Sequence, residues 1–373
     1  MNDRARALAL LRRIERESLF ASFVLAGETG FVRTLVLGVL RWRSRLDFVI
    51  ETLAKRAIEP EILDVLRLGA YQLLYMDVAQ YAAVGEAVEL APKRARGFVN
   101  AILRRITRGD VPEPRDLATR TAHPPWLIER WTRFYGADRA ARIAEANQEM
   151  SYPDVLALTG EAPPDATPST LAERIWKLRG SSAELDRAKF WPMDEGSAVI
   201  ASIASSLGDE VLDLAAAPGG KTLYMRRAGR RVISNDISIT RLMPLFKRDA
   251  TIVVSDARKP AFRTKFDVVL LDAPCSATGT IRKNPELKWR LRESDLAAFV
   301  TLQRDMIASA LSLAKKYVLY STCSLEREEN DDVVASSGAR IVPIENGSWI
   351  DDGVLRLTPE SGADGFTAHV ITH

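Results

Sequence analysis

The chain has 373 residues, of which 47% are hydrophobic and 27% are charged, with a formal net charge of +3 and two cysteines. This composition is ordinary for a globular protein, and the length allows more than one hydrophobic core, so we expect two or three domains. We find neither an apolar run of roughly 18 residues nor a signal peptide, so membrane and secreted proteins are disfavoured and two cysteines indicate the cytoplasm.

Residues 1–110 carry apolar residues at helical spacing, for example from Leu35 to Leu40 and from Val65 to Ala70. Pro60 suits the first turn of a helix, and a glycine with the VPEP sequence after it ends the pattern. We therefore expect an all-helical domain over residues 1–115.

A run of basic residues lies near the end of this region. Residues 1–110 contain 18 Lys and Arg against 13 Asp and Glu, and no acidic residue occurs from Ala91 to Gly109. A solvated helix face explains such a run as well as a phosphate-binding surface does. The candidate phosphate contacts are Lys93, Arg94, Arg96, Arg104 and Arg105.

Residues 116–188 predict a linker followed by a small mixed subdomain. WLIERWTRFYG at 126–136 has the pattern of a helix. DVLALTG at 154–160 predicts a short strand, EAPPDATPS at 161–169 a loop, and TLAERIWKL at 170–178 a second helix.

From residue 189 on, short apolar runs alternate with helical patterns. The runs are EVLDLAAA, RVISND, TIVVSD, FDVVLLDAP and KYVLYSTCS, followed by RIVPIE and FTAHVITH. This alternation predicts a parallel sheet with helices on both faces. In such a sheet, reactive residues gather at the carboxyl ends of the strands.

The sequence VLDLAAAPGGKT, residues 211–222, joins the first of these strands to a helix. Its small residues allow a ligand to approach the backbone, and the N-terminus of the helix offers free N–H groups. The spacing fits neither the P-loop pattern GxxxxGK[ST] nor the dinucleotide pattern GxGxxG, and a tight turn without a ligand stays open. The candidate ligand-binding residues are Ala215, Ala216, Ala217, Pro218, Gly219, Gly220 and Lys221.

Acidic residues end the next two strands. Asp236 ends VISND, and Asp256 follows TIVVS. A carboxylate in the first position can accept hydrogen bonds from ribose hydroxyls, and one in the second suits the edge of an adenine. Either residue alone would also suit a helix N-cap. Consecutive strands that end in this way favour a nucleoside-containing ligand.

The two cysteines, Cys275 in DAPCS and Cys323 in STCS, each follow an apolar run that predicts a buried strand. They could also be small buried residues, a disulfide or metal ligands. A reducing compartment weighs against a disulfide, and zinc needs about four ligands whereas the three histidines lie far away in sequence, so we expect no metal. A cysteine nucleophile is the functional interpretation that we favour.

Several segments together resemble the RNA cytosine-C5 methyltransferases: AAAPGGKT, DAPCSATGT, GTIRKNPELKW, YSTCS and LTPESGADGFTAHV. The helical region with GAYQLLYMD and GFVNAILRRI resembles the NusB-like domain that one branch of these enzymes carries. Nearly the whole chain is thereby similar to the bacterial 16S rRNA cytosine-C5 methyltransferases of the RsmB, Sun or Fmu family. The pairing of DAPCSATG with STCS is the most specific part of the resemblance.

The resemblance implies a fold and a domain organisation. Residues 1–115 would form an all-helical NusB-like RNA-binding domain, and residues 116–188 a linker with a small α+β subdomain that contacts RNA. Residues 189–373 would form an α/β class I (Rossmann-like) methyltransferase domain with a mostly parallel seven-stranded sheet. We expect a monomer.

The resemblance also implies a reaction, in which a methyl group passes from S-adenosylmethionine to C5 of a cytosine and S-adenosylhomocysteine is the product. Cys323 would be the nucleophile that adds to C6, and Cys275 would help to release the product. Asp272 would adjoin the cofactor and hydrogen-bond the cytosine ring. The loop that ends at Lys221 would hold the methionine end of the cofactor, Asp236 the ribose and Asp256 the adenine.

RNA is the implied partner, with 16S rRNA favoured over tRNA or another rRNA site. The candidate RNA contacts are the basic run named above and three residues after the DAPCS motif, Arg282, Lys283 and Lys288. A non-catalytic RNA-binding or assembly factor is the other alternative, and the presence of both cysteines and of Asp272 weighs against it.

The chain departs from the family pattern in four places. The segment after Asp236 is short, the strand at 154–160 lacks an arginine, and Met193 stands where glutamine is frequent. The first change implies a trimmed crossover helix and affects the register of Asp256, whereas the other two concern RNA positioning more than methyl transfer. Ala215 stands where cysteine is common, which should not matter because the loop acts through its backbone.

Overall fold

The computed structural model describes residues 2–345 and 347–373 of the chain, which form two compact units. The helical unit consists of the described residues up to Glu149 together with Ile281–Leu291. The sheet unit consists of Met150–Thr280 and the described residues of Arg292–His373. This division differs from the three domains expected from the sequence, because the chain up to Glu149 stays with the helical unit and the small sheet after it belongs to the sheet unit.

The helical unit confirms the all-helical prediction for the N-terminal region. Its elements are α1 (Asp3–Glu17), α2 (Ala21–Val24), α3 (Gly30–Ala54), α4 (Pro60–Tyr75), α5 (Gln80–Leu90), η1 (Lys93–Ala95), α6 (Arg96–Thr107), α7 (Leu117–Arg120), α8 (Pro125–Tyr135), α9 (Ala137–Ala146) and α13 (Leu287–Arg290). Pro60 occupies the first turn of α4, as expected, and the side chain of Thr29 caps α3 by accepting from Val32 N at 3.3 Å.

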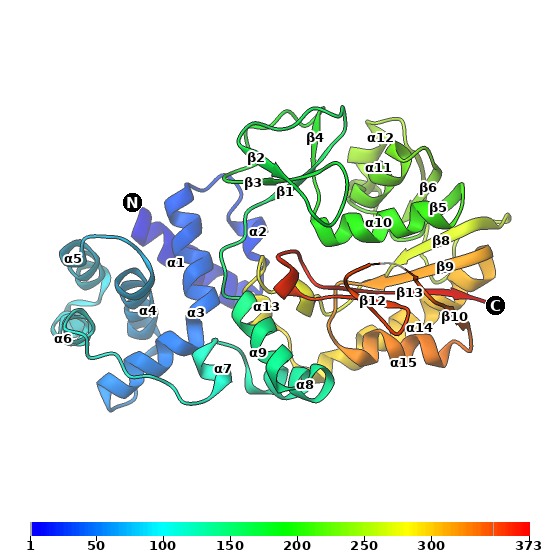
Figure 1. Ribbon diagram of the computed structural model, residues 1–373. Coiled ribbons are helices and arrows are strands. Elements are labelled where there is room, and N and C mark those ends of the chain that lie inside the picture. The colour runs from blue at the N-terminus through cyan, green and yellow to red at the C-terminus, as the bar shows by residue number, and fades with distance from the viewer. Residues whose placement is uncertain (1, 346) are drawn as a thin grey trace. The chain divides into compact units, whose positions relative to one another are not determined.

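The helices of this unit bury the apolar faces that the sequence pattern indicates. Leu35, Val36 and Val39 of α3 pack into one core with Val65 and Leu66 of α4. Figure 1 shows the helices α1 and α3 to α6, coloured blue to cyan, side by side.

A close approach between α3 and α4 depends on one glycine. A Cβ placed on Gly38 would lie 1.9 Å from the ring of Tyr71, so this position admits only glycine.

One part of the helical unit comes from far along the chain. The segment Ile281–Leu291 leaves the sheet unit after Thr280, enters the helical core and returns at Arg292. Trp289 Nε1 donates to the carbonyl oxygen of Leu40 at 2.6 Å, and the carboxyl group of Glu286 accepts from Ala21 N at 2.9 Å. These bonds attach the segment to α2 and α3.

The same segment buries two of the expected RNA contacts. Lys288 is 1% exposed and Arg282 is 6% exposed. Lys288 Nζ donates to the carbonyl oxygen of Arg41 at 2.8 Å, and Arg41 Nη2 donates to that of Arg282 at 2.8 Å. The expectation that Lys288 and Arg282 offer cations to RNA phosphates therefore conflicts with their burial, whereas Lys283 is partly exposed.

The sheet unit contains a large sheet of nine strands among the described residues. They are β5 (Glu210–Asp213), β6 (Arg231–Asp236), β7 (Thr251–Val254), β8 (Phe266–Asp272), β9 (Ala314–Thr322), β10 (Arg340–Val342), β11 (Ile350–Asp351), β12 (Val354–Leu357) and β13 (Phe366–Thr372). Their order is β11-β12-β13-β9-β8-β5-β6-β7, and β10 also pairs with β13.

The pairing in this sheet is mixed. The strands from β7 through β6, β5 and β8 to β9 are parallel, and those around β13 are antiparallel. The prediction of an α/β fold is thus correct, but a mostly parallel sheet of seven strands is not what the structure contains. The short C-terminal strands β11 and β12 account for part of the difference, since their sequences are too brief to show a strand pattern.

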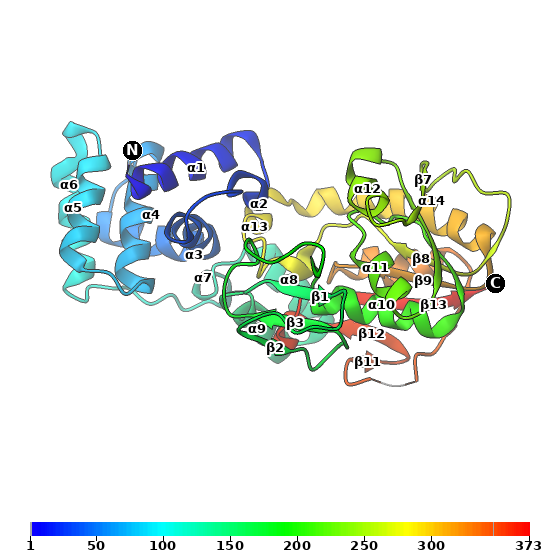
Figure 2. The same cartoon turned by 90° about the horizontal axis from the view of Figure 1, so that it is seen from above.

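Helices cover both faces of the large sheet, as the alternation of strands and helices predicts (Figures 1 and 2). One face packs on α10 (Glu195–Leu207), α11 (Gly220–Arg227) and α12 (Ile239–Phe246), and the other on α14 (Leu296–Leu313) and α15 (Asp331–Ser336). Consecutive residues of β8 alternate between the two cores, with Val268 and Leu270 on one side and Val269 and Leu271 on the other.

A smaller antiparallel sheet precedes the large one. It consists of β1 (Asp154–Ala157), β2 (Ala166–Pro168), β3 (Ile175–Leu178) and β4 (Phe190–Pro192), in the order β2-β3-β1-β4. The strand expected at 154–160 is present. The helix expected at 170–178 is wrong, because Ile175–Leu178 pairs with both β1 and β2 and tertiary pairing overrides the helical spacing.

Helix α14 and the turn before it, Glu293–Leu313, form a 21-residue segment with an 18-residue window of mean hydropathy 1.2, which by length and composition alone is enough to cross a membrane. The helix is nevertheless no uninterrupted apolar run, because Gln303, Arg304 and Asp305 lie in its middle. A core helix of a globular sheet passes the same test, and Met306, Ile307 and Leu313 of α14 are buried in the core of the sheet unit.

Replacing the buried Lys288 tests whether it serves the core rather than RNA. Burial and the nearby Arg41 guanidinium hold the pKa of Lys288 well below its ordinary value. The pKa of Lys288 is lower in the folded than in the unfolded chain, so the unfolded chain binds more protons. The free energy of unfolding of the wild type therefore rises with pH until the lysine of the unfolded chain loses its proton near pH 10. Lys288→Met should therefore raise the Tm at pH 7 by about 2–8 °C, and this gain should shrink toward pH 10.

Thermal unfolding followed by circular dichroism between pH 7 and pH 10 measures this effect. Lys265→Met, at an exposed position, is the control and should change the Tm by less than about 2 °C. A Lys288→Met protein that is less stable than the wild type at every pH would contradict the buried, destabilising lysine.

Candidate active site

The register of two neighbouring strands brings the two cysteine motifs together. β8 and β9 run parallel, and Asp272 at the end of β8 pairs with Ser321 near the end of β9. Ala273 N donates to the carbonyl oxygen of Ser321 at 2.8 Å, which continues the pairing beyond β8. The residues that follow the two strands, Cys275 and Cys323, therefore leave the sheet at the same edge.

The two sulfur atoms lie 3.4 Å apart, and both cysteines are free and partly exposed. The hydrogen bond to Cys323, burial, and the negative charges of Cys323 and Glu329 raise the pKa of the Cys275 thiol well above its ordinary value. Cys275 therefore holds its proton more tightly than an ordinary cysteine does, and either sulfur can be the donor in the contact between them. Both sulfurs therefore lie at one site.

A lysine–aspartate pair, whose Asp272 precedes Cys275 by three residues, shares the sheet edge of the cysteines. Lys221 Nζ lies 2.6 Å from Asp272 Oδ2 and donates to Ser197 Oγ at 2.8 Å. Ser321 Oγ donates to the other oxygen, Asp272 Oδ1, at 3.0 Å. Burial lowers the pKa of Lys221, but the Asp272 carboxylate outweighs it and the net shift is upward. Lys221 is thus a cation that fixes the orientation of Asp272.

The glycine-rich loop follows β5, as the sequence predicts, and Gly220 begins α11. Ala216 N donates to the carbonyl oxygen of Asn235 at 2.8 Å, and Ala217 N donates to Asp236 Oδ2 at 3.1 Å. Gly219 has a φ of +113°, and a Cβ there would lie 2.4 Å from Leu245. This position therefore requires glycine, and the loop presents mainly backbone to a ligand.

The buried carboxyl group of Asp213 supports the glycine-rich loop through a hydrogen bond to the helix that follows it. Asp213 is 1% exposed, and burial raises its pKa to about 7. Thr222 Oγ1 donates to Asp213 Oδ2 at 2.7 Å and also lies 2.8 Å from Ser234 Oγ. Thr222 of the AAAPGGKT motif thus anchors the first turn of α11 to the sheet rather than facing a ligand.

The two expected nucleoside contacts lie at the ends of β6 and β7. Besides its bond from Ala217, Asp236 accepts from Ser238 N at 3.0 Å, and Ser238 rather than Asp236 caps α12. Asp256 pairs with Arg258 at 2.6 Å, and this hydrogen bond lowers the pKa of Asp256. Asp236, Asp256 and Asp272 thus lie at the carboxyl ends of β6, β7 and β8. The glycine-rich loop follows β5, which lies between β8 and β6, so all of these groups share one edge of the sheet.

A buried glutamate, which the sequence reasoning missed, holds the two cysteine loops together. Glu329 is 0% exposed, and its carboxyl group accepts from both Ser276 Oγ and Ser324 Oγ, the residues directly after the cysteines. Ser276 N donates to Glu329 Oε1 at 2.8 Å, and Gln303 Nε2 of α14 donates to the same oxygen at 3.0 Å. The only sequence signal for this role is an acidic residue six positions after Cys323 within a polar stretch.

The backbone of the two loops is equally tight. Gly279 N donates to the carbonyl oxygen of Cys323 at 2.9 Å, and Gly365 N donates to that of Gly279 at 2.8 Å. A Cβ on Gly279 would lie 2.3 Å from the Gly365 oxygen and 2.9 Å from the Cys323 oxygen. Any other residue would push these backbone segments apart.

The basic run of the helical unit is partly neutralised. Arg94 pairs with Glu59 at 2.5 Å and Arg105 with Asp110 at 3.2 Å, whereas Arg96 donates to the carbonyl oxygen of Glu89 at 3.1 Å. Lys93 and Arg104 are exposed. The acids come from outside the acid-free stretch, so the sequence overstated the charge of this surface.

Metal ligation was not expected here. Within residues 2–345 and 347–373, no group of three or more His, Cys, Asp and Glu side chains is arranged to hold a metal ion.

Two family models match the sequence. The model of the 16S rRNA methyltransferase RsmB/F matches residues 201–341, and the model of the NusB family matches residues 1–108. The first match covers the loop and both cysteine motifs, and the second covers α1 to α6.

Curated relatives match over nearly their whole length. The probable ribosomal RNA small subunit methyltransferase B of Bacillus subtilis is 29% identical over 96% of this chain and 96% of its own length. The ribosomal RNA small subunit methyltransferases B of Citrobacter koseri and Salmonella typhi are 30% and 31% identical, each over 91% of this chain and 89% of their own length.

Solved structures share the fold. The crystal structure of PH0851 superposes over 100% of this chain and 99% of its own with a TM-score of 0.77 at 24% identity. A methyltransferase homologue from Pyrococcus horikoshii covers 69% of this chain and 98% of its own, with a TM-score of 0.58 at 22% identity.

The role of Glu329 can be tested by removing part of its capacity to accept hydrogen bonds. Glu329→Gln places an amide N–H₂ group among the donors of Ser276, Ser324 and Gln303, so at least one buried donor loses its partner. We expect the free energy of unfolding to fall by about 1–3 kcal/mol. The cysteine loops should also loosen, so that a thiol reagent modifies the native protein several times faster.

Urea unfolding and the rate of thiol modification by a chromogenic disulfide measure the two effects. Glu345→Gln, an exposed glutamate of the same unit, is the control and should change neither quantity. Wild-type stability and wild-type thiol reactivity in Glu329→Gln would show that the network does not hold the loops.

Proposed function

This chain belongs to the ribosomal RNA small subunit methyltransferase B family of S-adenosylmethionine-dependent RNA methyltransferases, and from that premise we propose that it methylates C5 of a cytosine in 16S rRNA. The observation that carries the proposal is the 3.4 Å approach of Cys275 Sγ and Cys323 Sγ, on the same sheet edge as the Lys221–Asp272 pair. A methyltransferase that acts on an already nucleophilic atom has no use for two such cysteines.

The chemistry of cytosine explains why a thiol is needed. C5 of the aromatic ring is a poor nucleophile, and addition of the Cys323 thiolate to C6 turns C5 into an enamine-like carbon. The bound cofactor supplies an electrophilic methyl group on a sulfonium. C5 would take this methyl group as its bond to the sulfonium breaks, which leaves the neutral thioether S-adenosylhomocysteine. A base then removes the C5 proton, and that electron pair restores the C5–C6 double bond as the Cys323 thiolate leaves C6.

We assign different roles to the two cysteines. Cys323 is the nucleophile, as the resemblance implies. The raised pKa of Cys275 supports this assignment, because a sulfur that keeps its proton at neutral pH is a weak nucleophile. Cys275 instead acts in product release, next to the sulfur that must depart from C6.

Asp272 orients the target base in this proposal. Each of its carboxylate oxygens accepts one hydrogen bond in the structure, from Lys221 and from Ser321, and keeps a lone pair for a further donor. The exocyclic amine of cytosine is such a donor. Lys221 therefore acts through Asp272, a narrower role than the direct contact with the methionine end of the cofactor that we expected.

The remaining cofactor contacts follow the sheet edge. We propose that the Pro218–Gly220 backbone holds the methionine end of the cofactor, in a loop whose Gly219 is required by its packing against Leu245. We propose that Asp236 binds the ribose and Asp256 the adenine. The Arg258 partner of Asp256 stays available to neutralise that carboxylate when the adenine is absent.

We place the reaction in the cytoplasm, on ribosomal RNA. The NusB-like match of residues 1–108 supports an RNA-binding role for the helical unit, with Lys93 and Arg104 as its exposed cations. Methylation of tRNA and a silent, non-catalytic role are the outcomes that the following experiments separate from this proposal.

Removing each cysteine in turn tests the covalent mechanism. Cys323→Ala should lower the methylation rate by at least about 10³-fold, because C5 is not activated without the adduct. Cys275→Ala should accumulate a protein–RNA adduct that survives denaturing electrophoresis with labelled RNA and disappears in the Cys275→Ala/Cys323→Ala double variant. An adduct from Cys323→Ala instead would reverse the assignments.

Mapping 5-methylcytosine identifies the substrate. Bisulfite sequencing of rRNA and tRNA from a deletion strain should show the loss of a 5-methylcytosine in 16S rRNA, restored by the wild-type gene and not by Cys323→Ala. Unchanged 16S rRNA with a loss in tRNA would move the activity to tRNA. Unchanged RNA, together with no S-adenosylmethionine binding in calorimetry, would support the silent role.

A further inference from the structure

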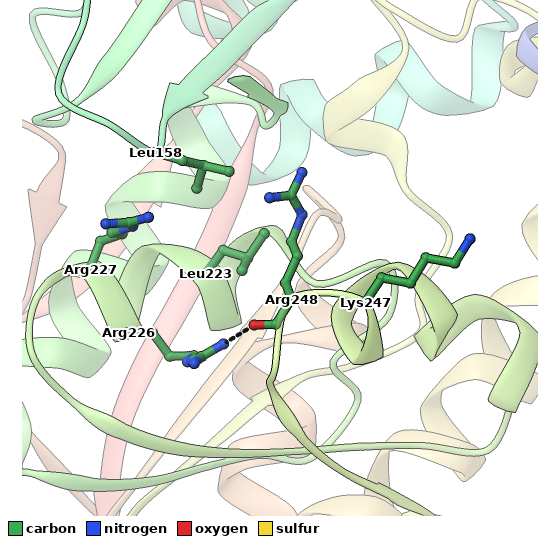
Figure 3. A pocket seen from close by; sticks show the side chains of 6 residues that line it. All are labelled: Leu158, Leu223, Arg226, Arg227, Lys247 and Arg248. Carbon is green, nitrogen blue, oxygen red and sulfur yellow. Dashed lines mark hydrogen bonds between the residues drawn. The ribbon is translucent and has the colours of Figure 1, made fainter. Parts of the chain in front are cut away.

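The sheet unit contains a basic cavity that neither the sequence motifs nor the proposed mechanism uses. Its volume is about 480 Å³, and its lining residues are Leu158, Leu223, Arg226, Arg227, Lys247 and Arg248 (Figure 3). This volume is in the range of pockets that hold a nucleotide-sized group. Two apolar side chains form part of the wall, and all the other lining residues are cations.

The cations come from the ends of two helices that the sheet brings together. Arg226 and Arg227 end α11, and Lys247 and Arg248 follow α12. No acidic residue lines the cavity, and within the described part of the chain none of the four forms an ion pair. The basic run of the helical unit differs in this respect, since Glu59 neutralises Arg94 there.

Stabilisation of helix C-termini explains only part of this arrangement. Arg226 Nη1 donates to the carbonyl oxygen of Arg248 at 2.9 Å and so serves a helix end (Figure 3). Arg248 stacks over the Trp191 ring at 5.1 Å and donates to the carbonyl oxygen of Arg187. These contacts fix two guanidinium groups in place.

The other two cations are exposed. Arg227 and Lys247 are both exposed, and neither side chain makes a hydrogen bond within the described residues. Four like charges that line one cavity raise its positive potential and favour an anion beside them. The arrangement therefore points to an anionic ligand rather than to a structural role alone.

A second cavity connects this site with the cofactor loop. Its volume is about 610 Å³; it shares Lys247 and Arg248 with the first cavity and extends along Trp191 to Pro218. Pro218 belongs to the loop that we assign to the cofactor. A chain of phosphates and bases could thus run from the basic cavity along an aromatic wall to the loop.

We propose that the basic cavity binds phosphodiester groups of single-stranded substrate RNA beside the target cytosine. Arginine and lysine are the residues that contact RNA phosphates, and the Arg248–Trp191 pair adds an aromatic surface beside them. A free inorganic anion would not need the aromatic wall or the continuation to Pro218. This inference rests on the proposed function, since it names where the substrate of that same reaction is held.

Charge reversal of the two exposed cations tests the proposal. Arg227→Glu/Lys247→Glu should weaken binding of a 16S rRNA transcript by at least about tenfold in filter-binding assays at low salt. The slope of log Kd against log salt concentration should decrease by about 1.4, or about 0.7 for each lost phosphate contact. The Kd for S-adenosylmethionine and the kcat at saturating RNA should stay within about twofold.

A control with the same change in charge is Arg263→Glu/Lys265→Glu. These exposed residues precede β8, at the edge of the sheet opposite to the cofactor loop, and should alter RNA affinity by less than about threefold. The milder Arg227→Gln/Lys247→Gln variant should lie between wild type and charge reversal. Unchanged S-adenosylmethionine binding shows that each variant is folded.

Equal loss of RNA affinity in the cavity variant and in the control would overturn the proposal, because it would reflect net charge alone. Unchanged affinity in the cavity variant would also overturn it. In both cases a wild type that still methylates RNA leaves the proposed function intact. A wild type that binds RNA through the cavity but methylates none would instead refute the proposed function and keep the RNA site.

Discussion

The buried carboxyl group of Glu329 is the interaction on which the geometry of the candidate active site depends. It lies between the loops that follow β8 and β9 and receives hydrogen bonds from Ser276 and Ser324. The parallel register of the two strands brings the loops to one edge, and the shared acceptor together with the Gly279–Cys323 backbone hydrogen bond holds their sulfurs 3.4 Å apart. Gln303 carries the same network into α14, so the core helix beneath the sheet also supports the site.

The site therefore separates positioning from chemistry. Lys221, Ser321 and Glu329 do not need to touch a substrate, because each acts by orienting Asp272 or a cysteine loop. Asp213, whose pKa lies at about 7, supports the glycine-rich loop in the same indirect way through Thr222. These groups are buried or partly buried and each makes at least one side-chain hydrogen bond, which is how a rigid reactive centre is held at the end of a sheet.

Much of this site was predictable from the sequence, since strand ends and short motifs are local. The two cysteines, Asp272 and the loop before α11 lie where alternation of strands and helices predicts them. Glu329 and the basic cavity were not predictable, because their partners come from distant segments. Burial of Lys288 was missed for a related reason: a basic residue in a polar segment looks exposed until the fold shows which core receives it. The strand Ile175–Leu178 was missed because its pairing partners decide its structure.

The path of the segment Ile281–Leu291 has a consequence for the order in which the chain folds during synthesis. A helical N-terminal domain ordinarily completes its core as soon as it leaves the ribosome. Here Trp289 and Lys288 donate to carbonyl oxygens of Leu40 and Arg41, so the core stays incomplete until residue 291 has been made. At bacterial rates of about 5–20 residues per second, the interval after residue 149 is roughly 7–28 s. The nascent helices must remain unaggregated through that time. Strands β5 to β8 of the sheet are made before the core of the helical unit is complete.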